Sequence, residues 1–273
     1  MFLVLVAILW SSGGFFIKAV PWNPLAIAGT RSGIAAAVML AFRRRMDLHG
    51  GTAQMGGAVC YAATVILFVV SNKLTTAANA ILLQYTAPIY VAALSYWFLK
   101  ERLMKWDPAA AILTVGGIAL FFLDDLSSGG LWGNITAICS GMAFAGTILL
   151  LRKQKDRSPL ESIFLGNILT FLIGFPFMFR SSPGAAGWMG LIFLGVFQLG
   201  CSYILYAEAI KHVTAFEGIL IPILEPILNP LWVFLLLGEM PGGWAVVGGC
   251  VVLATVTARC MLALKQGPPS MAP

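Results

Sequence analysis

Long apolar runs follow one another along almost the whole chain, and only short polar stretches separate them. Ten of these runs approach the ~20 residues that an α-helix needs to span a ~30 Å hydrocarbon core. They cover residues 2–20, 24–42, 54–71, 76–98, 107–123, 130–151, 160–179, 186–206, 213–237 and 242–264. The pattern predicts an all-α integral membrane protein with ten transmembrane helices and no sizeable domain outside the membrane.

The ninth run interrupts its apolar pattern with carboxylates and prolines. Glu217, Glu225 and Asn229 lie on one stripe with a spacing of four or eight residues. A charge at the centre of a lipid-spanning helix costs about 3 kcal/mol, so Glu225 needs a partner, a cavity or a proton. Proline removes a backbone N–H and leaves an earlier carbonyl without its helical donor. The run therefore predicts one wall of a polar site at mid-membrane. We expect helix breaks at Pro88, Pro222, Pro226 and Pro230.

Polar and aromatic side chains within other runs extend this predicted site. Arg31 lies about halfway along the second run, where it either binds a substrate carboxylate or is neutralised by Glu225. Gln198, Ser202 and Tyr206 recur every four residues on the eighth run, which makes that run a second candidate wall. The candidate substrate-binding residues are Trp10, Arg31, Asn79, Gln84, Tyr85, Gln198, Ser202, Tyr203, Tyr206, Glu225 and Asn229, with Glu225 also the candidate for proton coupling.

Composition agrees with a membrane protein, and charge predicts its orientation. Only 10% of the residues are charged, against roughly 25% in soluble domains. The chain has 17 lysines and arginines. If both termini lie in the cytoplasm, only Lys18, Lys73 and Arg180 fall on the outer side, and Arg31 lies inside a span. This bias follows the positive-inside rule, so the net charge of +6 needs no nucleic-acid partner. We predict a multi-pass protein of the inner cell membrane with cytoplasmic termini.

Motifs for catalysis, nucleotide binding and metal binding are missing from the sequence. The 5 cysteines are scattered without a CxxC pair, and no converging Ser, His and Asp set occurs within the apolar runs. A GxxxxGK[ST] loop for ATP is also absent. We therefore expect no metal, no cofactor and no enzymatic activity.

An internal repeat divides the chain. Shifting the sequence by 138 residues aligns proline, glutamate and tryptophan in one register, as in the pairs Thr76 and Thr214, Pro88 and Pro226, Glu101 and Glu239, and Trp106 and Trp244. Because each copy holds five predicted spans, an odd number, the two copies must cross the membrane in opposite senses. We predict two inverted five-helix repeats, residues 1–127 and 128–264, followed by a disordered cytoplasmic tail at 265–273.

Three stretches carry a resemblance to a family. They read ILWSSGGFFIKAVPWNPLAIAGTRSGIAAAVML, LLQYTAPIYVAALSYWFLKERL and ILEPILNPLWVFLLLGE. They resemble the drug/metabolite transporter superfamily in its ten-helix EamA-type branch, in which a proline is followed thirteen residues later by a glutamate in each half. The resemblance implies a carrier without a covalent cofactor, whose central cavity is lined by helices 1–4 and 6–9. Helices 5 and 10 would then pack at the periphery, and Glu101 and Glu239 would be structural.

These observations predict a secondary active transporter, an exporter of a small metabolite such as an amino acid, that works by alternating access around a central cavity. Glu225 is the candidate for coupling to protons, and the choice between a proton and a sodium ion stays open. The partners of the transporter would be the small-molecule substrate and the lipid bilayer, with the protein a monomer or a homodimer. The alternatives are an uptake carrier for another small organic solute and, less favoured, an intramembrane enzyme or a non-transporting scaffold.

Overall fold

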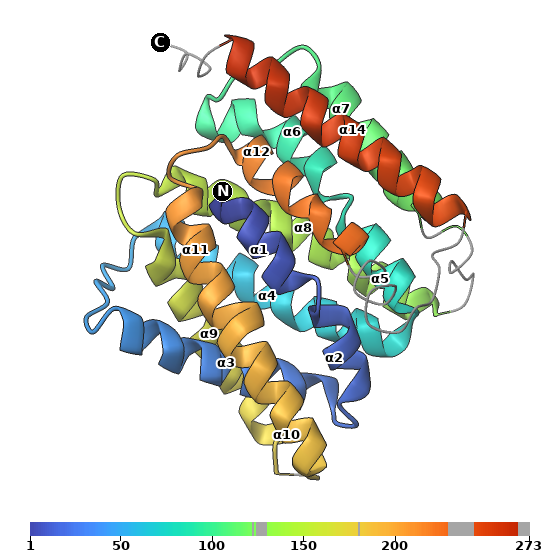
Figure 1. Ribbon diagram of the computed structural model, residues 1–273. Coiled ribbons are helices and arrows are strands. Elements are labelled where there is room, and N and C mark those ends of the chain that lie inside the picture. Colours follow the sequence, from blue (N-terminus) through green and yellow to red (C-terminus); the bar gives the residue numbers. More distant parts are fainter. Residues whose placement is uncertain (122, 124–129, 180, 229–242, 267–273) are drawn as a thin grey trace.

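The computed structural model describes residues 1–121, 123, 130–179, 181–228 and 243–266 (Figure 1). Every regular element within these ranges is a helix. The elements are α1 (Phe2–Trp10), α2 (Gly13–Ala19), α3 (Pro24–Phe42), α4 (Thr52–Leu74), α5 (Ala77–Gln84), α6 (Ala87–Leu99), α7 (Asp107–Phe121), α8 (Leu131–Lys153), α9 (Pro159–Gly174), η1 (Phe175–Phe177), α10 (Gly184–Phe193), η2 (Leu194–Cys201), α11 (Ser202–Ala209), α12 (Ala215–Leu220), η3 (Ile221–Leu224) and α14 (Gly243–Gln266).

Eight helical stretches in the described residues are long and apolar enough to cross a membrane. They are Phe2–Ala19, Pro24–Phe42, Thr52–Leu74, Ala77–Leu99, Leu131–Lys153, Pro159–Phe177, Gly184–Ala209 and Gly243–Ala263, and the apolar helix Asp107–Phe121 is shorter. The prediction of an all-α membrane protein is thus confirmed. The ninth predicted span, 213–237, is described only as far as residue 228. Asn229, Pro230, Glu239 and most of the predicted tail lie outside the described residues.

Burial in the described part of the chain suits a lipid environment. Large apolar side chains such as Trp97, Ile112 and Met189 lie on the surface, whereas Arg31 and Asn72 are buried. An extensive apolar surface of this kind is unfavourable in water and marks contact with lipid or another protein. The polar groups therefore gather inside the helix bundle, where they can line a site.

Helix starts follow local sequence signals. Asn23 precedes Pro24 and its side chain accepts hydrogen bonds from the first backbone N–H groups of α3. Thr76 and Thr214, which the 138-residue shift pairs, both cap a helix, because the hydroxyl of each accepts the backbone N–H of the residue three positions later. The two halves of the chain therefore begin equivalent helices in the same way.

Packing separates a polar interior from a peripheral helix pair. α4 packs against α8 and α9, and α3 packs against α9 and η2. α7 and α14 pack on each other at one edge of the molecule, with α14 drawn in red in Figure 1. Gly248 allows this approach, because a Cβ there would lie 2.4 Å from the Gly117 carbonyl oxygen. The peripheral position expected for helices 5 and 10 agrees with this arrangement.

Candidate functional site

Four of the predicted spans lose regular α-helical geometry near the middle of the bundle. The first helix stops at Trp10, and the fourth is broken between Gln84 and Ala87. Leu194–Cys201 is a π-helix and Ile221–Leu224 a 3₁₀-helix. Irregular backbone at membrane depth is tolerated only inside protein or against a wet cavity, and discontinuous helices of this kind surround the sites of many transporters. The break after Trp10 was not predicted from the sequence.

Residues in or next to the four irregular segments line one small cavity. Its volume is about 40 Å³, which holds a few water molecules but no organic solute. The lining residues are Trp10, Arg31, Thr64, Val65, Phe68, Gln84, Tyr85, Phe144, Gln198, Leu199, Tyr203 and Glu225. Side chains must therefore move apart before a metabolite can enter.

The basic side of the cavity is formed by Arg31. This side chain is 1% exposed, and its Nη1 donates to Gln198 Oε1 at 3.1 Å. Gln198 lies in the π-helix and packs against Gly13, where a Cβ would approach the amide nitrogen to 2.8 Å. Arg31 forms no ion pair within 4 Å in the described part of the chain, and its buried Nε has no hydrogen-bond acceptor there.

The acidic side of the cavity is formed by Glu225. Its Oε2 accepts a hydrogen bond from the Tyr85 hydroxyl at 2.5 Å. Tyr85 follows directly after α5, so the helix break brings its side chain to the ninth span. Because Glu225 bonds to Tyr85 and Arg31 bonds to Gln198, the two charges line one cavity without an ion pair between them.

Aromatic rings form another part of the cavity wall. Trp10 lies with its ring centroid 5.0 Å from Tyr203 and 5.9 Å from Phe144. The Trp10 Nε1 donates to Ser202 Oγ at 2.9 Å. Since its only polar atom is bonded to the protein, Trp10 offers a solute its ring alone.

Hydrogen bonds between helices hold the broken fourth segment in place. Gln84 Nε2 donates to Ser140 Oγ at 2.8 Å, and Ser140 Oγ donates to the Thr64 carbonyl at 3.1 Å. α8 comes close at Gly141, where a Cβ would lie 2.7 Å from the Gln84 carbonyl oxygen. The polar residues of α4, α5 and α8 thus keep the helix break at the cavity.

The structure brings most of the predicted site residues together. Those that line the cavity are Trp10, Arg31, Gln84, Tyr85, Gln198, Tyr203 and Glu225. Ser202 and Tyr206 lie behind Trp10, to which Ser202 is hydrogen-bonded and on which Tyr206 stacks. Asn79 does not line this cavity: it bonds to Asn134 at 3.1 Å near the start of α5.

Sequence reasoning missed several lining residues. They are Thr64, Val65, Phe68, Phe144 and Leu199. A usable signal existed for Phe144, because it shares a helical face with Ser140 and Thr147, both buried and polar. The apolar lining residues have no such sequence signal, because apolar residues occur throughout the chain.

Glu217 does not belong to the cavity wall, contrary to the stripe that predicted it. One carboxylate oxygen accepts the Thr214 backbone N–H in a capping box, and the other pairs with Arg259 at 2.7 Å. Arg259, which the charge pattern assigned to the cytoplasmic side, lies in α14, is 4% exposed and also pairs with Asp107 at 2.9 Å. Glu217 has the spacing of the predicted stripe, but it lies in the first turn of α12. There it caps the helix and pairs with Arg259 of α14.

A second ion pair ties the same end of the bundle. Glu101 pairs with Arg152 at 2.6 Å and accepts the backbone N–H of Ala215 at 2.9 Å. Arg152 also donates to the carbonyls of Ile210 and Lys211. We call Glu101, Asp107, Arg152, Glu217 and Arg259 the end clamp. It joins α12 to α6, α7, α8 and α14 through charged hydrogen bonds.

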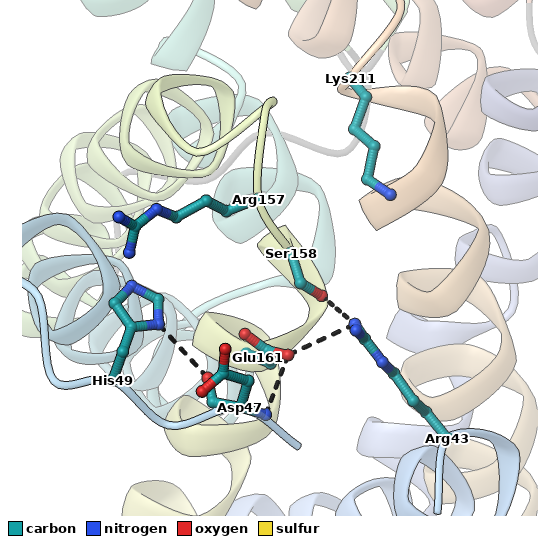
Figure 2. A pocket seen from close by; sticks show the side chains of 7 residues that line it. All are labelled: Arg43, Asp47, His49, Arg157, Ser158, Glu161 and Lys211. Atoms are coloured by element: carbon teal, nitrogen blue, oxygen red, sulfur yellow. Dashed lines mark hydrogen bonds and ion pairs between the residues drawn. The ribbon is translucent and has the colours of Figure 1, made fainter. Parts of the chain in front are cut away.

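A second pocket, of about 400 Å³, lies where residues 43–49, residues 157–161 and Lys211 meet (Figure 2). Its lining residues are Arg43, Asp47, His49, Arg157, Ser158, Glu161 and Lys211. Glu161 pairs with Arg43 at 3.4 Å and accepts the Asp47 backbone N–H, so its buried charge is matched within the protein. Figure 2 shows Arg157 beside His49, with Lys211 on another side. The pocket gathers basic residues that the charge pattern predicts on one side of the membrane.

Comparison with known proteins decides the family. The model of the EamA-like transporter family matches two stretches, residues 1–123 and 131–258. This chain belongs to the EamA-like transporter family. The EamA-like chain is therefore a multi-pass membrane transporter, and not an enzyme.

Relatives of this EamA-like chain carry transporter names. An uncharacterized transporter of Archaeoglobus fulgidus is 28% identical over 258 residues, which cover 93% of each chain. Human solute carrier family 35 member G1 is 22% identical over 72% of this chain and 59% of its own. A known crystal structure matches with a TM-score of 0.79 at 17% identity over 97% of both chains, which shows a shared fold.

Proposed function

We propose that this EamA-like protein is a secondary active exporter of a small metabolite, such as an amino acid, with its site at the central cavity. The observation that carries the proposal is that Arg31 and Glu225 line one buried cavity where four spans are irregular. Intramembrane charges are costly and generally mark a substrate or ion pathway. Trp10, Tyr203 and Gln84 would complete the binding site.

Alternating access is the mechanism that we propose. A cavity of about 40 Å³ cannot hold a metabolite, so binding requires the surrounding segments to separate. Two inverted five-helix repeats would rock about the site and expose it to each side in turn. The two family-model matches, one in each half of the chain, support such repeats. The irregular segments at Trp10, Gln84 and Gln198 would serve as the hinges.

Proton coupling through Glu225 completes the proposal. Glu225 can take up or release a proton next to the Tyr85 hydroxyl, and substrate and proton would then compete or cooperate at one cavity. The test is Glu225→Gln in proteoliposomes. We expect solute movement driven by a pH gradient to fall at least tenfold, while exchange of labelled for unlabelled solute persists at saturating solute concentration. Glu208→Gln, at a side chain that is 49% exposed, is the control and should keep the coupled flux.

Two outcomes would contradict parts of this proposal. Unchanged pH-driven flux in Glu225→Gln would exclude the coupling role. Accumulation of solute inside intact cells that carry the protein would show uptake instead of export. The proposed cytoplasmic termini in the inner membrane are tested with a C-terminal reporter that is active only outside the cytoplasm, which should stay inactive.

A further inference from the structure

Arg31 is a permanently charged side chain, and the described residues supply it with no carboxylate. It is 1% exposed, and within the described part of the chain its Nη1 donates a hydrogen bond to Gln198, a neutral amide. A buried charge without a counter-ion is among the costliest features of a folded protein. The same chain does supply carboxylates elsewhere, because the buried Arg259 pairs with both Asp107 and Glu217. Something beyond helix packing must account for the difference.

We propose that a carboxylate of the transported solute is the counter-ion of Arg31, and that a cationic group of the same solute binds at Glu225 and Tyr85. This inference rests on the proposed transport function and deepens it, because it names the solute as a small dipolar molecule of net charge zero.

The orientation of the guanidinium supports a carboxylate as its ligand. Nη1 is bonded to Gln198, whereas Nε has no acceptor among the described residues. This leaves the edge formed by Nε and Nη2, whose two parallel N–H groups match the two oxygens of a carboxylate. Gly13 leaves room for the Gln198 amide, because a Cβ at position 13 would lie 2.8 Å from the amide nitrogen. Gln198 therefore orients Arg31 without neutralising it.

The charge of the lining residues favours a dipolar solute over a plain anion. Glu225 is the one acid among the residues that line the cavity in the described part of the chain. A dianion such as a phosphate ester would bring two negative charges toward Arg31 and leave an excess beside Glu225 in a poorly polarisable interior. A molecule with one carboxylate and one ammonium group leaves no excess charge. Its carbon skeleton would lie against Trp10, Phe144 and Tyr203.

The experiment measures binding to the purified full chain by thermal shift and by counterflow in proteoliposomes. The probes are leucine, phenylalanine and threonine, each with its amide, which lacks the carboxylate, and its deaminated acid, which lacks the ammonium group. We expect at least one amino acid to raise the melting temperature, with its two analogues binding at least tenfold more weakly. Equal binding of an amino acid and its amide, or of any phosphate ester at the site, would overturn the inference.

Substitution of Arg31 tests directly whether this side chain recognises the carboxylate. Arg31→Gln should bring the affinity ratio between the amino acid and its amide from tenfold or more to about one, whereas a purely structural role would weaken both ligands equally. Arg31→Lys keeps the charge but not the paired N–H edge, so it should retain part of the ratio and also covers a failure of Arg31→Gln to fold. Counterflow of some solute without any carboxylate dependence would refute this inference and leave transport standing. Absence of counterflow for every probe and for an extended panel of metabolites would refute both.

Discussion

Two buried arginines of this protein have opposite surroundings. Arg259, in the end clamp, is 4% exposed and bonded to two carboxylates. Arg31, at the central cavity, is 1% exposed and bonded to one amide, although Glu225 lines the same cavity. The clamp thus matches its charges within the protein, whereas the cavity keeps its acid and its base apart. The difference distinguishes charges that stabilise the fold from charges available to a ligand.

The backbone around the two regions differs in the same sense. The clamp ties the ends of regular helices, with Thr214 capping α12 and Glu101 bonded to its first N–H. The cavity lies where Tyr85 and Gln198 occupy a helix break and a π-helix. Regular hydrogen-bonded ends resist movement, and irregular segments can change conformation at lower cost. We therefore expect the clamp to dominate stability and the cavity to dominate transport.

The largest effect is expected from matched substitutions of the two arginines. Arg259→Met leaves the buried Asp107 and the partly buried Glu217 without their cation, which should lower the free energy of unfolding by about 3–5 kcal/mol. Arg31→Met removes an unmatched charge and one hydrogen bond, so the loss should be about 1 kcal/mol or less. Equilibrium unfolding in mixed micelles measures both. Equal losses of stability in the two variants would contradict the different roles assigned to the two arginines.

Glu101→Gln should have the next largest effect. Glutamine keeps an acceptor for the Ala215 N–H but loses the ion pair with Arg152, whose side chain is 12% exposed. Charged hydrogen bonds of this kind contribute about 1.5–3 kcal/mol, and we expect a loss in that range. The same unfolding assay checks it, together with Glu101→Asp, whose shorter side chain keeps the charge. A stability equal to the wild type would show that the clamp does not hold this end.

A pair of glycine substitutions compares the cavity with the peripheral helices. In Gly141→Ala the new Cβ would lie 2.7 Å from the Gln84 carbonyl oxygen, so α8 must move from the helix break, at a cost of about 1–3 kcal/mol. Gly116→Ala in α7 meets nothing within 4 Å and should stabilise by about 0.5–1 kcal/mol. Transport should fall in the first variant only. A harmless Gly141→Ala would mean that close packing at the break is unnecessary.

The smallest effect is expected for Lys211, which lines the pocket of Figure 2. Lys211 pairs with Glu208 at 2.7 Å, but the Glu208 side chain is 49% exposed. Exposed ion pairs contribute about 0–1 kcal/mol, so Lys211→Gln should change the free energy of unfolding by less than about 1 kcal/mol. A loss above about 2 kcal/mol would show that Lys211 stabilises the fold as the end clamp does.

The sequence by itself determined the class of fold, the eight spans that the described residues contain and most of the residues that line the cavity. Apolar runs long enough for a bilayer must be helices, because a lone strand cannot satisfy its backbone in lipid. Arg31 and Glu225 were visible for a related reason: charge is so costly in a membrane interior that its presence alone indicates a site. The repeat likewise predicted Thr76 and Thr214 as equivalent positions, and both cap helices.

Only the tertiary structure decided which charges meet. Arg31 and Glu225 were open to pairing, and Glu217 had the right spacing for the cavity, yet Glu217 bonds to Arg259 and Glu225 to Tyr85. Spacing along a helix determines the face on which a residue lies, but not how deep it sits or which distant helix packs there. The break after Trp10 and the π-helix at Gln198 also depend on neighbours, because serine and glycine are compatible with regular membrane helices until packing selects another geometry.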